Sequence, residues 1–241
     1  MVNAFSKQSL NLVVVGLLVG TLISQPAWAQ PATGDKMSEK PAGFVQRYHR
    51  LAHAQELLGK HYTHSVARSG ERIRKINYLI YGWTRDRLPK KYRSQYKEIA
   101  QTIIDQSLAY KLDPVLLMSV IQGESSFKPR MVGKVGEIGL MQIRPTTGKW
   151  IASMHGIPWK GKKSLYDPIT NIRIGAAFLN YLRDQFDMHA QLYLAAYNMG
   201  QGNVKDALIR KVWPKEYPVH VMKYYVEFYA EIKERESQEK T

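Results

Sequence analysis

The chain has 241 residues, a formal net charge of +15 and no cysteine. Without cysteine it can form neither a disulfide nor a lipid anchor on a processed cysteine, so an ordinary hydrophobic core must stabilise it. This length allows one domain of about 150 residues, which buries roughly two-thirds of its unfolded surface, and a smaller extension.

The first segment has the pattern of a secretory signal peptide. One charge, Lys7, precedes an uncharged apolar run from Leu10 to Ile23, and Ala27-Trp28-Ala29 follows. The run holds about fourteen residues, whereas a membrane-spanning anchor needs about twenty. We therefore predict that residues 1–29 are cleaved after Ala29 and that the mature protein is periplasmic and not lipid-anchored.

A polar leader and a helical segment follow. Residues 30–40 hold almost no bulky apolar group, which predicts a flexible leader. Apolar residues recur at helical spacing through residues 41–91 and indicate two or three accessory helices. His61 and His64 have no third potential ligand nearby, so we expect them on the surface and not in a metal site.

The excess positive charge is concentrated between Lys36 and Lys97. An exported protein does not meet nucleic acid, and no nucleic-acid motif interleaves these basic residues, so we expect no nucleic acid partner. Two explanations of the charge stay open: contact with an anionic envelope surface, and a solvated surface that keeps the protein soluble.

Helical signals become sharper from residue 92 onward. An apolar stripe there predicts an amphipathic helix, and it consists of Ala100, Ile103, Ile104 and Leu108. Asp113-Pro114 has the pattern of an N-cap followed by a first-turn proline, and Asp167-Pro168 repeats it. A further helix ends at the glycine-containing turn 198–202. The last helix has an apolar stripe of Val221, Tyr225, Phe228 and Ile232.

Strand signals are nearly absent, so the predicted fold class is mainly α. We place the main domain over residues 92–236 and a disordered tail over residues 237–241. The segment from Lys128 to Gly139 mixes glycine, valine and charge without a helical period. It is expected to be a loop, with or without a short hairpin.

Glu124 is the carboxyl whose position suggests chemistry. It lies three residues after Ile121 and seven after Leu117, so a helix that persists from Pro114 points it along an apolar stripe. Burial there disfavours the ionised form and raises the pKa toward neutrality, as a general acid requires. If the helix instead ends at Gly123, Glu124 only caps a turn in solvent.

Three motifs in this chain resemble those of the lytic transglycosylase family. The first runs from Glu124-Ser125-Ser126-Phe127 through Gly139-Leu140-Met141-Gln142-Ile143, with Pro129, Pro145 and Thr147. The second is Ala196-Tyr197-Asn198-Met199-Gly200, and the third is Tyr225-Val226. The resemblance covers the chain from Tyr92 to Ile232, and the motifs stand in the family's order.

The resemblance implies a lysozyme-like α-helical domain with a glycan groove. Such an enzyme cleaves the β-1,4 bond between N-acetylmuramic acid and N-acetylglucosamine and leaves a 1,6-anhydro end. Glu124 is then the single catalytic acid and base, and neither metal nor cofactor is needed. Two alternatives stay open, a lysozyme-like hydrolase and a peptidoglycan-binding protein without turnover.

By the same resemblance, four residues are candidates for substrate binding. The Gln142 amide suits a sugar acetamido group, although it can also bond the local backbone. Tyr197 can approach Glu124 or the substrate, and Asn198 can bind sugar or hold its turn. Tyr225 is a core residue by its spacing, whereas the resemblance also brings it to the site.

The chain departs from the family pattern at three positions. Gly133 stands where the family commonly has serine, and Val221 stands where it often has glutamate. Glu137 stands where the family usually has a small residue. Glu137 is either an exposed loop charge or a group that restores polarity near Gly133 or positions a water, and activation of that water would make the enzyme a hydrolase.

Overall fold

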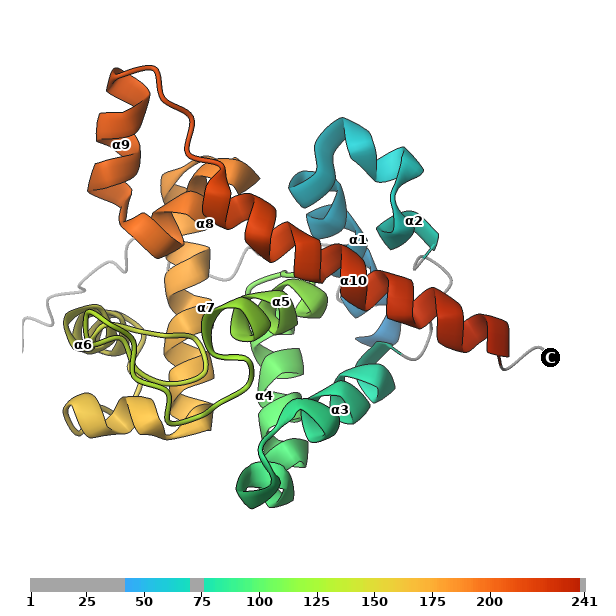
Figure 1. Cartoon of the computed structure of the whole chain (residues 1–241), viewed down its shortest axis with the longest axis horizontal. Helices are drawn as coiled ribbons and strands as arrows, with labels where there is room; N and C mark the ends of the chain where they lie inside the picture. Colours follow the sequence, from blue (N-terminus) through green and yellow to red (C-terminus); the bar gives the residue numbers. More distant parts are fainter. Residues whose placement is uncertain (1–41, 70–75, 239–241) are drawn as a thin grey trace, which may run out of the picture. The chain divides into compact units, whose positions relative to one another are not determined.

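We describe the protein from a computed structural model, which covers residues 42–69 and 76–238 (Figure 1). The predicted signal peptide, residues 1–29, and the leader, residues 30–40, lie outside the described residues. Within the described ranges there is no strand, and the only extended pairings are isolated bridges of Ile138 with Val132 and with Ile143. The prediction of a mainly α fold is confirmed.

Thirteen helical segments make up the described chain, ten of them α-helices. The α-helices are α1 (Ala42–Leu58), α2 (Val66–Ser69), α3 (Ile76–Arg87), α4 (Tyr96–Ala109), α5 (Pro114–Ser125), α6 (Pro145–Met154), α7 (Pro168–Gln185), α8 (Ala190–Met199), α9 (Gln201–Ile209) and α10 (Glu216–Gln238). The 3-10 segments are η3 (Gly59–His64), η5 (Lys90–Gln95) and η6 (Lys162–Tyr166). Helices therefore form within residues 42–69 and 76–87, and α10 extends to Gln238.

Helix α5 is the buried element around which the others pack. Asp113 is its N-cap and accepts a hydrogen bond of 2.9 Å from the backbone N–H of Val115, while Pro114 occupies the first turn. Every residue from Pro114 to Ile121 is buried. The long helix α10 packs along α5 (Figure 1). This packing explains why a helix with an apolar surface on all sides is stable here.

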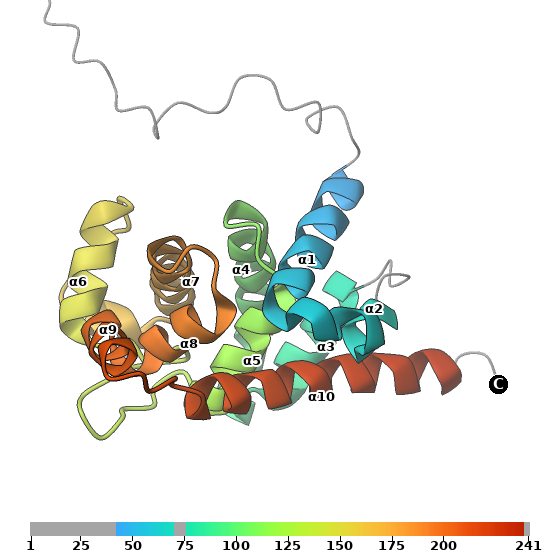
Figure 2. The same cartoon turned by 90° about the horizontal axis from the view of Figure 1, so that it is seen from above.

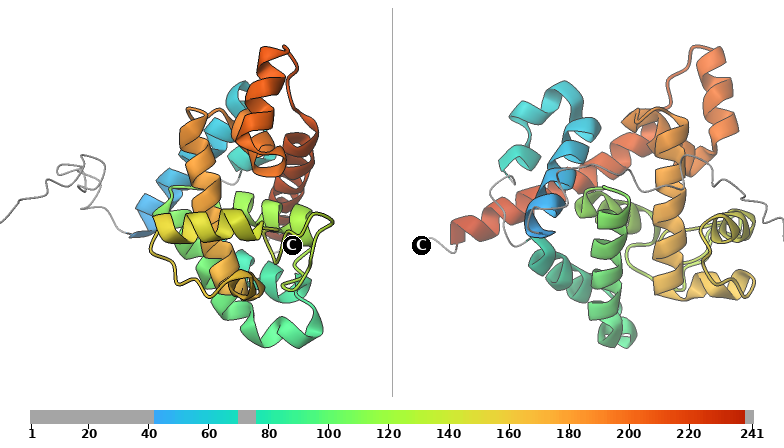
Figure 3. Two further views of the ribbon diagram at one scale, coloured as in Figure 1. Left: turned by 90° about the vertical axis from the view of Figure 1, so that its left-hand side faces the viewer. Right: turned by 180° about the vertical axis from the view of Figure 1, so that it is seen from behind.

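The remaining helices form the walls beside α5. Figure 2 shows α7 between α6 and α4, and it contacts both of them. Helix α8 packs against α7 and α10, and α9 continues from the end of α8 (Figure 3). The chain then returns through residues 210–215 to the start of α10. None of the helices in the described ranges is long and apolar enough to span a membrane.

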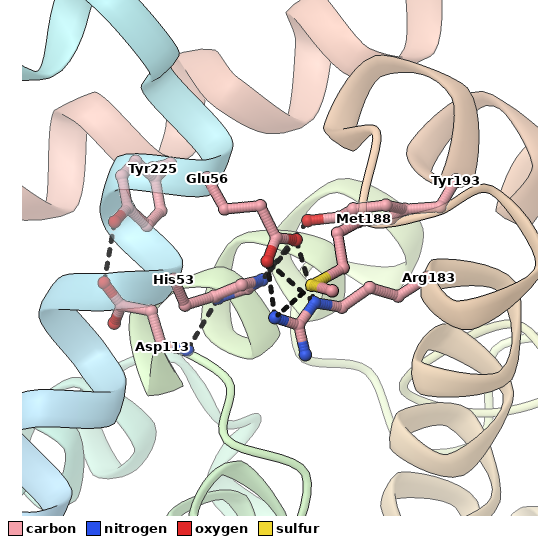
Figure 4. Close-up of polar contacts among 7 residues, drawn as sticks. All are labelled: His53, Glu56, Asp113, Arg183, Met188, Tyr193 and Tyr225. Carbon is pink, nitrogen blue, oxygen red and sulfur yellow. Dashed lines mark hydrogen bonds and ion pairs between the residues drawn. The ribbon is translucent and has the colours of Figure 1, made fainter.

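Helix α1 is tied to the start of α5 by buried polar side chains (Figure 4). His53 is 1% exposed, and its Nδ1 accepts a 2.8 Å hydrogen bond from the backbone N–H of Asp113. Its Nε2 lies 3.2 Å from the Tyr193 hydroxyl. Burial lowers the pKa of His53 well below its ordinary value, and the nearby charge of Arg183 lowers it further. The ring is therefore neutral at neutral pH.

Two contacts that involve charged side chains also join α1 to α7 and α10. Arg183 of α7 forms a bidentate ion pair with Glu56 of α1. Arg50 of α1 is 1% exposed and donates to the Tyr229 hydroxyl at 3.1 Å. The hydroxyls of Tyr225 and Tyr229 both donate to Asp113 at 2.6 Å. The Asp113 carboxyl thus joins α5 and α10, while its backbone N–H bonds to His53 of α1.

Candidate active site

Glu124 lies in the last turn of α5, which runs to Ser125. The alternative in which the helix ends at Gly123 is therefore wrong. The helix ends at Ser126, whose left-handed backbone (φ 48°) closes the turn. The Ser125 hydroxyl is buried and donates to the backbone oxygen of Leu140 at 2.8 Å. This contact fixes the end of α5 against the segment that carries Gln142.

The Glu124 carboxyl is partly buried and has one hydrogen bond from a tyrosine. The hydroxyl of Tyr217, at the start of α10, donates to Glu124 Oε1 at 2.5 Å. Burial raises the pKa of Glu124 to about 7, the Tyr217 hydrogen bond opposes the rise, and the charge of Glu137 adds to it. A carboxyl with this pKa is populated in both the acid and the base form near neutral pH.

A cleft of about 280 Å³ opens in front of Glu124. Its walls come from the loop before α6, from α6 and α7, and from the junction of α8 with α9. The residues that line it are Glu124, Glu137, Gln142, Ile143, Arg144, Thr147, Phe178, Ala196, Tyr197, Asn198, Met199 and Gly200. The lining is therefore rich in hydrogen-bonding groups and suits a polar ligand.

The segment before Gln142 is held by a buried amide. Gly139 has a positive φ of 87°, and a Cβ there would be 2.3 Å from Asn171 Nδ2, so only glycine fits. Asn171 is fully buried; its Nδ2 donates to the backbone oxygen of Ile138, and its Oδ1 accepts from the Met141 N–H, both at 2.8 Å. These bonds connect the cleft wall to α7.

Gln142 lines the cleft, but its amide nitrogen is used locally. This nitrogen donates to the backbone oxygens of Gly139 at 2.9 Å and Met131 at 3.2 Å. The two roles considered for Gln142, a bond to the local backbone and a contact with the sugar, therefore belong to different atoms of its side chain. Its nitrogen bonds the local backbone, and its oxygen is the atom left to accept a hydrogen bond from a ligand.

Tyr197 and Asn198 lie at the opposite wall, at the end of α8. The Tyr197 hydroxyl donates to the backbone oxygen of Met141 at 2.9 Å, so it links two cleft walls. Its ring stacks on that of Tyr217, with centroids 6.5 Å apart. Asn198 is exposed and lines the cleft. The structure thus brings Glu124, Gln142, Tyr197 and Asn198 together.

Tyr225 is the predicted substrate residue that the structure does not bring to the cleft. It is fully buried, and its hydroxyl donates to Asp113 at the far end of α5. The residue that α10 presents to Glu124 is Tyr217, two turns earlier, which the sequence analysis missed. Nothing in the local pattern around Tyr217 marks it, because its partner lies 93 residues away in sequence.

Two of the three departures from the family pattern also lie at or beside the cleft. Glu137 lines it, with a side chain 22% exposed, and Gly133 faces Glu137 across a tight turn. Val221 is fully buried on the apolar stripe of α10.

Within residues 42–69 and 76–238 no three His, Cys, Asp or Glu side chains are grouped so that they could hold a metal ion.

The helical domain carries one desolvated acid, Glu124, at the end of the buried helix α5, and this acid faces a polar cleft. Residues 101–219 match the family model "Transglycosylase SLT domain". This range of the chain is therefore similar to the transglycosylase SLT domain. The matched range begins within α4 and ends near the start of α10, so α1, α2 and α3 lie outside it.

Several known proteins are similar to this chain. The soluble lytic murein transglycosylase of Escherichia coli K12 is 35% identical over 122 residues, which is 50% of this chain and 18% of that protein. The corresponding Salmonella typhimurium enzyme is 39% identical over 89 residues, or 36% and 14%. The transglycosylase of Enterobacteria phage PRD1 is 37% identical over 128 residues, or 51% and 41%.

A solved structure supports the same fold. The crystal structure of an inactive glutamate-to-glutamine mutant of the lytic transglycosylase Slt from Pseudomonas aeruginosa superimposes with a TM-score of 0.51 at 29% identity. The match covers 55% of this chain and 24% of that one. This chain thus spans well under half of the length of each relative described here.

Proposed function

We propose that the protein is a peptidoglycan lytic transglycosylase. Its substrate is the β-1,4 bond between N-acetylmuramic acid and N-acetylglucosamine, and its product carries a 1,6-anhydromuramic end. The observation that carries the proposal is the environment of Glu124, a carboxyl with a pKa of about 7 that faces a polar cleft and accepts a hydrogen bond from Tyr217. The match of residues 101–219 to the transglycosylase SLT family model supports it.

Glu124 acts first as an acid and then as a base. In its protonated form it gives a proton to the glycosidic oxygen as the bond to the anomeric carbon of the muramic residue breaks. The acetamido group of that residue stabilises the cationic centre from within the substrate. The resulting Glu124 carboxylate then takes the proton of the C6 hydroxyl, whose oxygen bonds to the anomeric carbon. No water is consumed, and Glu124 returns to its starting state.

Gln142, Tyr197 and Asn198 would bind the glycan beside Glu124. The free side-chain oxygen of Gln142 can accept from the N–H of a sugar acetamido group. The ring of Tyr197 offers an apolar face, while its hydroxyl holds the wall in place through Met141. Tyr225 supports α5 through Asp113 and is assigned no contact with the glycan.

The protein would act outside the inner membrane, after cleavage of the segment predicted as a signal peptide. Peptidoglycan glycan strands are then its substrate, and the anionic surfaces of the envelope are within reach of the basic residues between Lys36 and Lys97. A net positive charge favours encounter with a wall polymer that carries carboxylates.

The direct test is turnover by a Glu124→Gln variant, which keeps the shape of the side chain but cannot transfer the proton. We expect it to digest purified sacculi at least about 10³-fold more slowly than the wild type while still sedimenting with them. Glu227→Gln is the matched control, because Glu227 is an exposed glutamate of α10 outside the cleft. Near-normal digestion by the Glu124 variant would exclude Glu124 as the acid.

A further inference from the structure

Gly133 and Glu137 face each other across a tight turn in the loop that leads to Gln142. The backbone N–H of Gly133 donates to the backbone oxygen of Glu137 at 2.8 Å. A Cβ at position 133 would lie 2.4 Å from Glu137 Oε2 and 2.7 Å from Gln142 Oε1, both closer than real contacts of this kind. The backbone of Gly133 does not itself require glycine, because its φ is not in the left-handed region. A side chain at position 133 would therefore displace the Glu137 carboxylate, the Gln142 amide or both from these positions.

The Glu137 carboxylate is fixed inside the cleft. Its Oε2 accepts from the backbone N–H of Val135 at 3.1 Å, and its Oε1 lies 3.9 Å from the Arg144 guanidinium. The side chain is only 22% exposed and lines the same cleft as Glu124. An ordinary loop glutamate would extend into solvent and would need no glycine opposite it.

We propose that Glu137 is a second functional carboxylate of the reaction, which stabilises the positive charge that develops at the anomeric carbon, and that Gly133 is glycine in order to accommodate it. This inference rests on the proposed function. It assigns Glu137 no proton transfer and no covalent bond, so the atoms and electrons of the reaction balance as they do with Glu124 alone.

The chemistry of the reaction gives such a carboxylate a defined role. Cleavage of a glycosidic bond passes through an oxocarbenium-like transition state, in which positive charge appears that the ground state lacks. A negative charge held in place beside that centre stabilises the transition state more than the substrate, and it therefore raises kcat rather than binding. The charge of Glu137 also raises the pKa of Glu124, which keeps the acid protonated at higher pH.

Several titratable or charged groups surround Glu124, and an assay over pH has to account for all of them. They are Tyr217 and His220 on α10, Tyr197 on α8, Arg144 at the start of α6, and Glu137. Among these groups Glu137 is the one carboxylate, and its charge raises the pKa of Glu124. Its removal should therefore move the pKa of Glu124 in one direction, downward.

The test compares Glu137→Gln, Gly133→Ala and Gly133→Ala/Glu137→Ala with the wild type on soluble glycan strands. We expect Glu137→Gln to lower kcat about 10- to 100-fold with little change in KM, and to move the alkaline limb of the kcat/KM profile to lower pH. Gly133→Ala should lose activity as well, because its methyl group displaces the Glu137 carboxylate and also meets the side-chain oxygen of Gln142. The double variant should lose no more activity than Gly133→Ala alone, since that single variant already removes the contribution of Glu137.

The proposal is overturned if Glu137→Gln keeps the wild-type kcat and pH profile, or if the losses of the single variants multiply in the double variant. It is also overturned if wild-type products carry reducing ends that disappear in Glu137→Gln, because Glu137 would then activate water. Glu227→Gln and thermal melting of each variant control for the loss of a charge and for misfolding. Inactivity of the wild type itself would instead contradict the proposed function.

Discussion

At the scale of single residues, the chemistry depends on opposing effects on one carboxyl. Burial raises the pKa of Glu124, and the hydrogen bond from Tyr217 lowers it. Together with the charge of Glu137, which also raises the pKa, these effects give a pKa of about 7. A carboxyl at its ordinary pKa would be almost fully ionised at neutral pH and would be a poor acid, whereas one raised much further would be a poor base.

Replacement of Tyr217 by phenylalanine should show that the Tyr217 hydrogen bond opposes the effect of burial on the pKa of Glu124. The variant loses the donor that favours the ionised form, so the pKa of Glu124 rises and the alkaline limb of the kcat/KM profile moves to higher pH. The Glu124 carboxylate left after proton transfer also loses a hydrogen bond, and we expect kcat to fall about tenfold or more. Tyr78→Phe, at a site 76% exposed, is the control. An alkaline limb that stays in place would contradict the assigned role of Tyr217.

The sequence was informative about Glu124 and much less about its neighbours. The apolar residues before Glu124 predicted that it is desolvated if the helix persists past Gly123, and α5 does run to Ser125. Tyr217 could not be found, because its contact with Glu124 depends on how α10 crosses α5. Tyr225 was misplaced for the same reason: a shared helix does not fix which tyrosine lies near the cleft.

At the scale of elements, local signals predicted the starts of α5 and α7, because the capping chemistry is local. Asp113 and Asp167 both accept a backbone N–H at the start of a helix, as their position before proline indicated. The stripe of α4 was less accurate, since Leu108 is 41% exposed and the buried position is Ser107. The helical period of the apolar residues does not by itself indicate at which residue the contact with a neighbouring helix ends.

Asp113 should be one of the most sensitive positions in the fold. Asp113→Ala removes the N-cap of α5 and leaves the buried hydroxyls of Tyr225 and Tyr229 without their acceptor. We expect a loss of about 3–5 kcal/mol in the free energy of unfolding. Asp113→Asn keeps the cap and an acceptor oxygen and should cost about 1–2 kcal/mol. Urea unfolding measures both, and equal losses in the two variants would show that the acceptor is unimportant.

At the scale of the whole molecule, the folding unit is larger than the family domain. The family match begins at residue 101, yet α1 supplies Arg50, His53 and Glu56 to polar contacts buried within the domain. Residue patterns predicted that helices precede the domain, but not that they complete its core. Charged and polar residues are predicted to lie on the surface unless their partners are known, and the partners of these three residues lie 60 to 179 residues away in sequence.

A chain that starts at residue 92 should therefore not fold stably. Its loss of α1 leaves Arg183, Tyr193 and the Asp113 N–H without buried partners, each at a cost of about 1–3 kcal/mol. The sum is comparable with the whole stability of a domain, about 5–15 kcal/mol. Circular dichroism during heating should show a cooperative transition for a chain that starts at residue 41 and none for the shorter chain. An unchanged melting temperature would mean that α1 is only an appendage.

The central claim, that Glu124 performs both proton transfers without water, is tested most directly by the ends of the products. Mass spectrometry of muropeptides released from purified sacculi distinguishes a 1,6-anhydro end from a reducing end by the mass of one water. The wild type should release 1,6-anhydro products, and the Glu124→Gln variant should release none above background. Reducing ends from the wild type, or anhydro products from the variant in similar yield, would contradict the claim.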